Sequence, residues 1–512
     1  MTPVAGIFFA LHLTASLVLA AYGYHRLSLA IRYVRRVRPL RRTAPDPPED
    51  LPSVTVQIPL YNERYVAARV VTAAGSLDYP RSLLEIQVLD DSSDETPLRV
   101  ARAVKELRGR GIRVHHVRRS NREGFKAGAL AHGLTLARGD LVAVFDADFV
   151  PPPDFLLRLV GEFNDPSVGM VQARWEHINR SSSLLTEVQA LQLDAHFRVE
   201  HGVRAATGCF FNFNGTAGIW RRSAIEAAGG WKADTLTEDV DLSYRAQMAG
   251  WRFIYRDDVT APAEVPVEVA AYRMQQQRWA QGGVETSLKL LPRLLTSSLT
   301  ARVKREAVWH LTGHFTYPAF VILALAGVSA AWLGEPLYRD RLFLVDGLLL
   351  TFATVSLAFF YSLPMQARWP NDWWKRLGLI PAIMVLGAGI AVGQTFAVAR
   401  GLARHRTPFW RTPKYRHVGT GDESWLSAAY RISGSGTALL EFLAGISILG
   451  CGVTAVVLGI LLPPGSMFLL GVGFLMTGGS TLAQQPRPKI WRKAHTPSLR
   501  ISDTVPLRDN CA

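Results

Sequence analysis

Two apolar regions, one toward each end of this 512-residue chain, restrict its possible folds more than any other feature. Residues 4–22 are apolar and long enough to cross the roughly 30 Å of hydrocarbon in a bilayer. After residue 305 the chain becomes apolar again, with candidate spans at residues 313–333, 342–363, 379–399, 436–461 and 466–480. Residues 53 to about 290 are expected to fold outside the membrane.

The first apolar segment could instead be a cleaved signal peptide. Its basic cluster follows the apolar run, at residues 32–38, whereas a signal peptide carries its basic residues first. There is also no convincing cleavage site. A membrane helix is therefore favoured, and the cluster places the segment after it in the cytosol by the positive-inside rule.

The chain has 57 Lys and Arg against 42 Asp and Glu, a formal charge of +15. The basic runs flank apolar segments, at residues 32–42, 400–416 and 487–493, which indicates a lipid bilayer as a partner. No motif suggests a nucleic-acid partner. The three cysteines form no metal-binding or disulfide pattern, as suits a reducing compartment. We expect an integral membrane protein of a bacterial inner (plasma) membrane with a cytoplasmic catalytic domain.

Two basic stretches, 368–376 and 400–416, should both be cytoplasmic, so the segment between them should not cross. Residues 379–399 contain a proline, glycines and a glutamine, and we predict an interfacial helix there. The predicted organisation is a first membrane helix with its basic flank (1–43), an α/β domain (44–300), a helix pair (301–376), the interfacial helix with a loop (377–435), a second helix pair (436–482) and a basic cytoplasmic tail (483–512).

The middle region alternates between short strands and helices. Strands are predicted at residues 54–58, 86–89, 114–117 and 141–145, with helices between them at 65–74 and 96–107. This alternation favours an α/β fold with a largely parallel sheet, whose ligands bind at the carboxyl ends of the strands.

Asp146 and Asp148 come directly after the last of these strands. Two carboxylates at such a turn can hold one Mg²⁺ or Mn²⁺ bound to a diphosphate, because hard cations prefer oxygen ligands. The ion would neutralise charge on a departing nucleotide diphosphate. The alternative, a solvated loop, is less favoured because further acidic motifs accompany this one.

Other acids end earlier strands. Asp90 and Asp91 are predicted to bind the base or ribose of a nucleotide, and the following Ser93 or Asp94 to cap a helix. Tyr61 and Glu63 would line the same pocket.

A glycine-rich segment, residues 121–128, includes Lys126 and suits close approach to phosphate, with a plain surface loop as the alternative. Thr237, Glu238 and Asp239 precede a predicted helix at 240–249, and a carboxylate there can deprotonate an acceptor hydroxyl. The alternative is ordinary helix capping.

The sequence Gln275-Gln-Gln-Arg278-Trp279 is unusual. Arg278 can pair with a diphosphate, and Trp279 offers a flat face to a sugar ring. The alternative is an amphipathic helix with a core tryptophan. Residues 407–414 carry Arg411 and Lys414, which could equally contact lipid headgroups or lie in a plain loop.

Taken together, Asp-Asp, Asp-Ala-Asp, Thr-Glu-Asp and Gln-Gln-x-Arg-Trp resemble the motifs of processive, inverting family 2 glycosyltransferases such as cellulose, mannan and hyaluronan synthases. The resemblance covers residues 50 to 415, and residues 124–130 and 275–279 are most similar to the cellulose synthase-like mannan and glucomannan synthases. It implies a GT-A (Rossmann-like) fold. No c-di-GMP-binding domain follows the spans, unlike in bacterial cellulose synthases.

The resemblance also implies roles for single residues. Asp239 would be the base, Asp146 and Asp148 would hold the metal, and the segment 411–414 is similar to a gating loop that closes over nucleotide. The donor-binding set would be Tyr61, Glu63, Asp90, Asp91, Lys126, Asp146, Arg278, Arg411 and Lys414, and the acceptor-binding set Glu238, Gln275 and Trp279.

The expected reaction is transfer of a hexose from GDP-mannose or UDP-glucose to a growing β-linked polysaccharide, with coupled secretion. The partners are the nucleotide sugar, the polysaccharide acceptor and the bilayer; export subunits are not specified by the sequence. Alternatives are a lipid-directed enzyme similar to ceramide glucosyltransferase, and a non-catalytic membrane protein that retains the fold.

Overall fold

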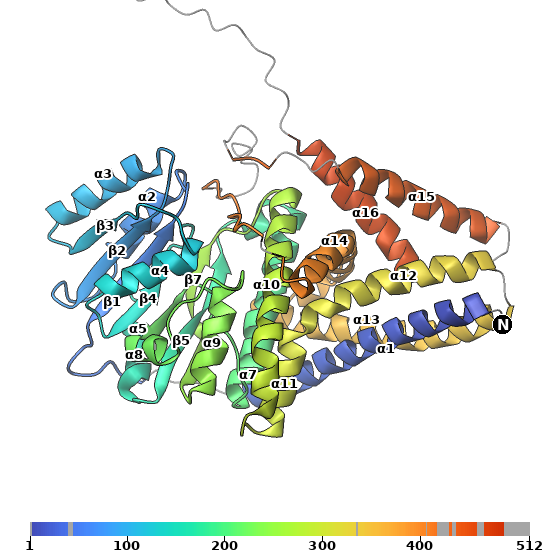
Figure 1. Cartoon of the computed structure of the whole chain (residues 1–512), viewed down its shortest axis with the longest axis horizontal. Coiled ribbons are helices and arrows are strands. Elements are labelled where there is room, and N and C mark those ends of the chain that lie inside the picture. Colours follow the sequence, from blue (N-terminus) through green and yellow to red (C-terminus); the bar gives the residue numbers. More distant parts are fainter. Residues whose placement is uncertain are drawn as a thin grey trace, which may run out of the picture.

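An α/β domain lies beside a group of long apolar helices in the computed structural model (Figure 1). The structure describes residues 3–38, 45–333, 336–405, 407–416, 430–432, 437–457 and 465–485. Most of the predicted tail (483–512) and of the segment after residue 416 lies outside these residues.

Seven strands form one mixed sheet in the order β3-β2-β1-β4-β6-β5-β7. Their bounds are β1 Val54–Leu60, β2 Leu84–Asp90, β3 Val114–Val117, β4 Leu141–Val144, β5 Val168–His177, β6 Gly218–Arg221 and β7 Arg252–Ala263. The four predicted strands are present, although β1 continues through Pro59 to Leu60. They pair in parallel, as expected, whereas β6 runs antiparallel to both β4 and β5.

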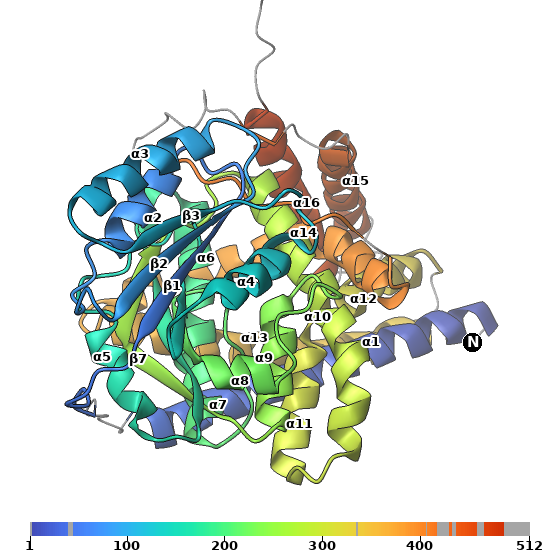
Figure 2. The same cartoon turned by 60° about the vertical axis from the view of Figure 1, so that its left-hand side comes forward.

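The strands of the sheet centre are buried on both faces, as their apolar composition predicts. In β4, Leu141 and Ala143 join one core cluster and Val142 and Val144 join the other, because successive side chains of a strand point to opposite faces. Helices α2 and α3 (Ala67–Ala74 and Thr96–Gly109) cover one face, and α4 (Phe125–Leu136) the other (Figure 2).

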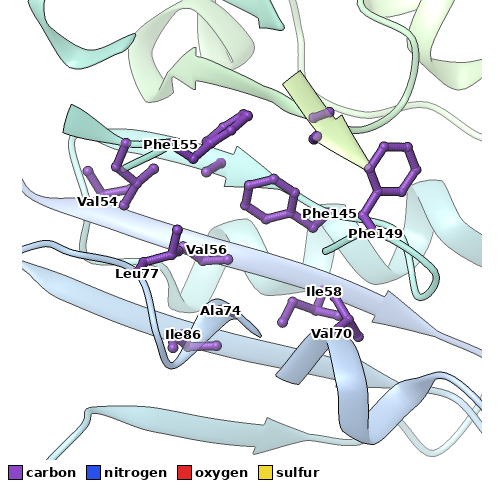
Figure 3. Close-up of a cluster of buried hydrophobic side chains, with 14 of the residues drawn as sticks. Val54, Val56, Ile58, Val70, Ala74, Leu77, Ile86, Phe145, Phe149 and Phe155 are labelled. Atoms are coloured by element: carbon purple, nitrogen blue, oxygen red, sulfur yellow. The ribbon is translucent and has the colours of Figure 1, made fainter. Parts of the chain in front are cut away.

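The cluster under α2 holds the first two strands in place. Val54, Val56 and Ile58 of β1 lie among Val70 and Ala74 of α2 and the rings of Phe145 and Phe155 (Figure 3). Full burial of each large side chain stabilises the fold by about 1.5–3 kcal/mol. This packing fixes where β1 and β4 end, and therefore where their polar continuations lie.

The remaining helices of the α/β region complete the domain and lead toward the apolar helices. They are α5 Leu157–Val160, α6 Leu184–Ala195, α7 Gly202–Ala206, α8 Arg222–Ala227, α9 Glu238–Met248, α10 Val269–Thr296 and α11 Ala301–Leu311. Helix α9 begins at Glu238, two residues earlier than predicted.

The apolar helices are α1 Pro3–Arg32, α12 Thr316–Leu333, α13 Pro336–Arg368, α14 Leu379–Leu402, α15 Thr437–Val457 and α16 Gly465–Ala483. Among the described residues four stretches are long and apolar enough to cross a membrane: Gly6–Val37, Gly347–Arg368, Trp373–Leu402 and Gly465–Ala483. These helices indicate a membrane protein.

Helix α14, which we predicted to be interfacial, is one of these four by length and composition. Figure 1 shows it nearly end-on, whereas α1, α12 and α13 run lengthwise across the picture. Its Gly389 approaches Gly473 of α16 closely, and its Gly401 approaches Val284 of α10, so α14 packs across both helices. A helix that crosses its neighbours in this way is compatible with a position at the membrane surface, and the interfacial assignment remains a prediction.

Cysteine labelling can test this assignment. If α14 does not cross, single cysteines at Asn371→Cys and His405→Cys, in a background with the three native cysteines replaced by alanine, should react with a membrane-impermeant thiol reagent from the same side. Labelling from opposite sides would show that α14 spans the bilayer.

Candidate active site

The carboxyl ends of the central strands open into a cleft of about 1250 Å³. Every predicted site residue except Asp90 lines it: Tyr61, Glu63, Asp91, Lys126, Asp146, Asp148, Glu238, Asp239, Gln275, Arg278, Trp279, Arg411 and Lys414. These residues are contributed by loops after β1, β2 and β4, by α4, α9 and α10, and by the segment after α14. In all, seven carboxylates and five cations line the cleft, an excess of two negative charges.

Asp146 stands at the exit of β4 and is paired with Lys126. The lysine Nζ lies 2.5 Å from Asp146 Oδ1 and donates to the carbonyl oxygen of Gly215 at 3.0 Å. The backbone N–H of Asp146 donates to Thr216 Oγ1, which fixes the turn. Lys126 is thus anchored at the base of the cleft, where a phosphate could approach it.

Asp148 lies deeper and is held on two sides. Its Oδ2 accepts from Lys414 Nζ at 2.7 Å and from the backbone N–H of Glu264 at 3.0 Å. Glu264 in turn pairs with Arg69, at 2.5 Å. Asp148 is therefore oriented before any ligand arrives.

The residues present fit a divalent cation that shares its ligands with a substrate. Asp146 and Asp148 both reach the cleft, and each is neutralised by a lysine. No group of three metal-ligating side chains occurs among the described residues. Two carboxylates completed by phosphate oxygens form the incomplete protein shell that is common for Mg²⁺.

Asp239 lies in the first turn of α9, close to Gly215. A Cβ atom at residue 215 would lie 3.1 Å from Asp239 Oδ2 and 3.2 Å from Lys126 Nζ, and this residue has φ +80°. The left-handed backbone favours glycine there, and a larger residue would also press on both side chains. Burial, with Glu238 beside it, raises the pKa of Asp239 to about 7, although Lys126 opposes the increase.

Asp90 does not line the cleft, which leaves its predicted role in donor binding without support from the structure. Its side chain is fully buried, where Oδ2 lies 2.8 Å from His116 Nε2 and Oδ1 accepts from the backbone N–H of Ser92. Asp90 thus shapes the loop, and Asp91 is the residue that faces the ligand space. Of the two predicted capping residues, Asp94 meets the start of α3, because its Oδ1 accepts from the N–H of Thr96.

Asp91 forms a bidentate ion pair with Arg119, whose Nε and Nη2 donate to the two carboxylate oxygens at 3.0 and 2.5 Å. Such bidentate pairs fix orientation as well as charge. Nearby, the guanidinium of Arg122 lies 3.3 Å from the centre of the Tyr61 ring. Neither arginine was among the predicted site residues.

The segment after α14, residues 407–416, also contributes side chains to the cleft. Arg411 Nη1 lies 3.2 Å from Glu63 Oε2, and Phe409 lies under the Arg278 guanidinium and against Phe125. Burial raises the pKa of Glu63 to about 8, opposed by the charge of Arg411. The predicted gating loop therefore reaches the cleft, but its cations contact carboxylates.

Comparison with known proteins agrees with this geometry. Residues 52–282 match the family described as "Glycosyltransferase like family 2". These residues form a family 2 glycosyltransferase domain. The identification confirms the resemblance inferred from the motifs.

The glycosyltransferase domain is similar to curated plant proteins. It is 44% identical over 247 residues to glucomannan 4-beta-mannosyltransferase 2 of Arabidopsis thaliana, covering 47% of this chain and 46% of that protein. It is 39% identical over 306 residues to glucomannan 4-beta-mannosyltransferase 1 of Oryza sativa subsp. japonica, covering 57% of each. The chain spans about half the length of the curated relatives it matches.

A solved structure with a similar fold is a mannosyltransferase of Pyrobaculum calidifontis in complex with GDP-Man and Mn²⁺. The match has a TM-score of 0.52 at 25% identity and covers 70% of this chain and 99% of that one. Together with the sheet order, it confirms a GT-A (Rossmann-like) fold for the glycosyltransferase domain.

A second cavity, of about 1660 Å³, continues from the glycosyltransferase cleft toward the apolar helices. Asp239, Gln275 and Trp279 line both cavities. The far part is lined by aromatic side chains of the apolar helices and of α11: Tyr22, Trp309, Tyr317 and Tyr361. Flat rings with polar edges suit the faces of sugar rings.

Sequence patterns could have indicated some of the missed residues. Arg119 lies in a basic run, 118–122, just before the glycine-rich segment. Gly215 follows Asn214 in a sequence Asn-Gly, which is typical of turns. Glu264 and His116 carry no such signal, because only the fold brings them to Asp148 and Asp90.

The raised pKa of Asp239 generates a prediction on pH. A general base must be deprotonated to act. Because the pKa of Asp239 is about 7, its carboxylate form is lost as the pH falls through 7. Turnover at saturating donor should therefore decline on the acidic limb of the pH profile. We expect the limb near pH 7, well above the usual pKa of an aspartate near 4. The measurement is turnover from pH 5 to 9.

Glu63 supplies the control, because its pKa is also raised. In Glu63→Gln the acidic limb should remain in place. A limb near pH 4, or one that disappears in Glu63→Gln, would contradict the assignment of Asp239.

Proposed function

We propose that the protein transfers a hexose from a nucleotide sugar to a growing β-linked polysaccharide, with inversion at the anomeric carbon. The single observation that supports this most is the convergence of Asp146, Asp148, Asp239 and Arg278 on one cleft of a family 2 domain. GDP-mannose is the favoured donor, since the curated relatives are glucomannan mannosyltransferases and the similar solved structure is bound to GDP-Man; UDP-glucose is the second choice.

Asp239 would act as the general base. Its carboxylate takes the proton of an acceptor hydroxyl, the hydroxyl oxygen forms a bond to the anomeric carbon, and the bond to the nucleotide diphosphate breaks. A pKa near 7 keeps a useful fraction deprotonated at neutral pH while leaving the group basic enough to accept a proton. Lys126 and the backbone of Gly215 fix the geometry around it.

Asp146 and Asp148 would hold Mg²⁺ or Mn²⁺, which, when bound, neutralises charge on the leaving diphosphate. Lys126 and Lys414, which now neutralise these aspartates, would then be free to contact phosphate oxygens. Arg278 and Arg411 face the same space and carry the same charge. The loop cations would thus exchange a carboxylate partner for a diphosphate.

The acceptor would enter through the second cavity. Its volume, its aromatic lining and its continuity with Asp239 favour an extended glycan over a short lipid-linked acceptor. The same path supports synthesis coupled to secretion through the apolar helices, with the domain on the cytoplasmic side. The named curated relatives are plant proteins, which gives no support for a bacterial inner membrane. Export subunits find no support in these comparisons.

A donor panel tests the proposed reaction. Purified protein in lipid, incubated with labelled GDP-mannose, UDP-glucose and other nucleotide sugars, should form a polymer from GDP-mannose or UDP-glucose. Asp239→Asn should reduce turnover by about 10²–10⁴, the usual contribution of a positioned base. Nucleotide affinity should change little.

The matched control is Asp234→Asn, which removes an exposed carboxylate from the loop before α9. It should leave turnover unchanged. A single-sugar lipid product would support the lipid-directed alternative, and equal activity of Asp239→Asn and the native protein would refute the proposed base.

Metal removal tests the aspartate pair. Activity should vanish in excess chelator and return with Mg²⁺ or Mn²⁺, because an ion held by Asp146 and Asp148 would neutralise charge on the leaving diphosphate. Asp148→Asn should weaken nucleotide diphosphate binding measured with the metal present. Asp154→Asn, on the same loop but exposed, is the control. Full activity in chelator would contradict the metal role.

A further inference from the structure

A basic cavity lies at the end of α1 beside α11, away from the glycosyltransferase cleft. It has a volume of about 1240 Å³. Three of its arginines, Arg32, Arg35 and Arg36, belong to α1 and the helical turn that continues it, and Arg302 and Arg305 belong to α11. Residues far apart in the sequence therefore gather five cations around one space.

The acid that lines this cavity does not neutralise it. Glu306 is buried, and its carboxylate already binds His25 at 3.1 Å, Arg204 at 3.2 Å and Arg32 at 3.4 Å. Burial raises the pKa of Glu306, but the hydrogen bond from His25 and the two arginine charges lower it to about 2. The negative charge of Glu306 is thus balanced by these three partners. The other arginines that line the cavity have no acid beside them there among the described residues.

Four of the arginines, Arg35, Arg36, Arg302 and Arg305, form no ion pair with any acid in the described part of the chain. All four are exposed. Like charges gathered without a counter-ion repel one another, so an anion that occupies the space would relieve this repulsion.

The position of the cavity indicates which anion. It lies at the basic end of the candidate span Gly6–Val37. Tyr24 and Trp309 line it, and such amphipathic rings are enriched at the membrane–water interface. Tyr24, Ile31 and Val34 are exposed on α1, where an acyl chain could lie.

We propose that this cavity binds the phosphate of an anionic phospholipid headgroup, with Arg35, Arg36, Arg302 and Arg305 as its ligands and the acyl chains along the exposed face of α1. Basic pockets between helices at the cytoplasmic surface are suited to such headgroups. None of these four arginines lines the cleft or the second cavity, although Trp309 lines both the second cavity and this one.

Native mass spectrometry of the detergent-purified full chain can test the site. The probes are phosphatidylglycerol, phosphatidylcholine and inorganic phosphate. Phosphatidylglycerol should bind and resist displacement by millimolar inorganic phosphate, and phosphatidylcholine should bind more weakly. Displacement by inorganic phosphate would instead identify a site for the free anion and overturn the lipid assignment.

The variant is Arg302→Gln with Arg305→Gln, which leaves the basic flank that orients α1 unchanged. The affinity for phosphatidylglycerol should fall about thirtyfold, or about 2 kcal/mol, for the loss of two interfacial arginines. The matched control is Lys375→Gln with Arg404→Gln, which removes two exposed cations beside α14. An equal loss in both variants would refute a specific site.

Nucleotide binding and the thermal midpoint serve to check folding, because neither arginine lies in the cleft. If Arg302→Gln with Arg305→Gln has normal nucleotide binding, a normal thermal midpoint and unchanged lipid affinity, the cavity is not the binding site.

Discussion

The structure of the cleft depends on pairing carboxylates with cations that arrive from distant parts of the chain. Asp146, Asp148 and Glu63 each contact a lysine or arginine, and two of these cations come from the segment after α14. Without such partners a group of buried acids would be costly, because like charges in a partly desolvated space repel strongly. The cations that pair with these acids therefore also lie where they could bind an anionic ligand.

This pairing also explains why the loop and the domain form one unit. Lys414 contacts Asp148, while the next residue, Tyr415, donates to Glu268 at the start of α10. These contacts orient Asp148 and place the cations of the segment at the cleft. Its role as a gating loop remains a prediction.

A second ionic centre links the domain to the first membrane helix. The carboxylate of Glu306 in α11 contacts His25 and Arg32 of α1 and Arg204 of α7. Breaking a buried network of this kind is strongly destabilising, because a charge is left without a partner. The network thereby links the domain to α1, and two of its members, His25 and Arg204, line the second cavity that leads from Asp239 toward the helices.

The sequence alone was sufficient for the local features. The apolar runs at 54–58, 86–89 and 141–145 predicted strands because buried strands need apolar side chains on both faces, and the acids that follow them had to lie at one edge of a parallel sheet. Asp146 and Asp148 could be proposed on this basis, and Asp239 from its place before a predicted helix. The cytoplasmic side of the basic runs remains a prediction.

Only the tertiary structure decided which side chain of each motif faces the ligand. Asp90 and Asp91 are neighbours, and the sequence treats them alike, yet one is buried against His116 and the other is held by Arg119 at the cleft. Arg411 and Glu63 are 348 residues apart, and the turn signal Asn214-Gly215 does not show that Gly215 lies against Asp239. Local patterns follow from the periodicity of a single strand or helix, whereas these contacts depend on how separate elements pack. That packing determines which charges meet.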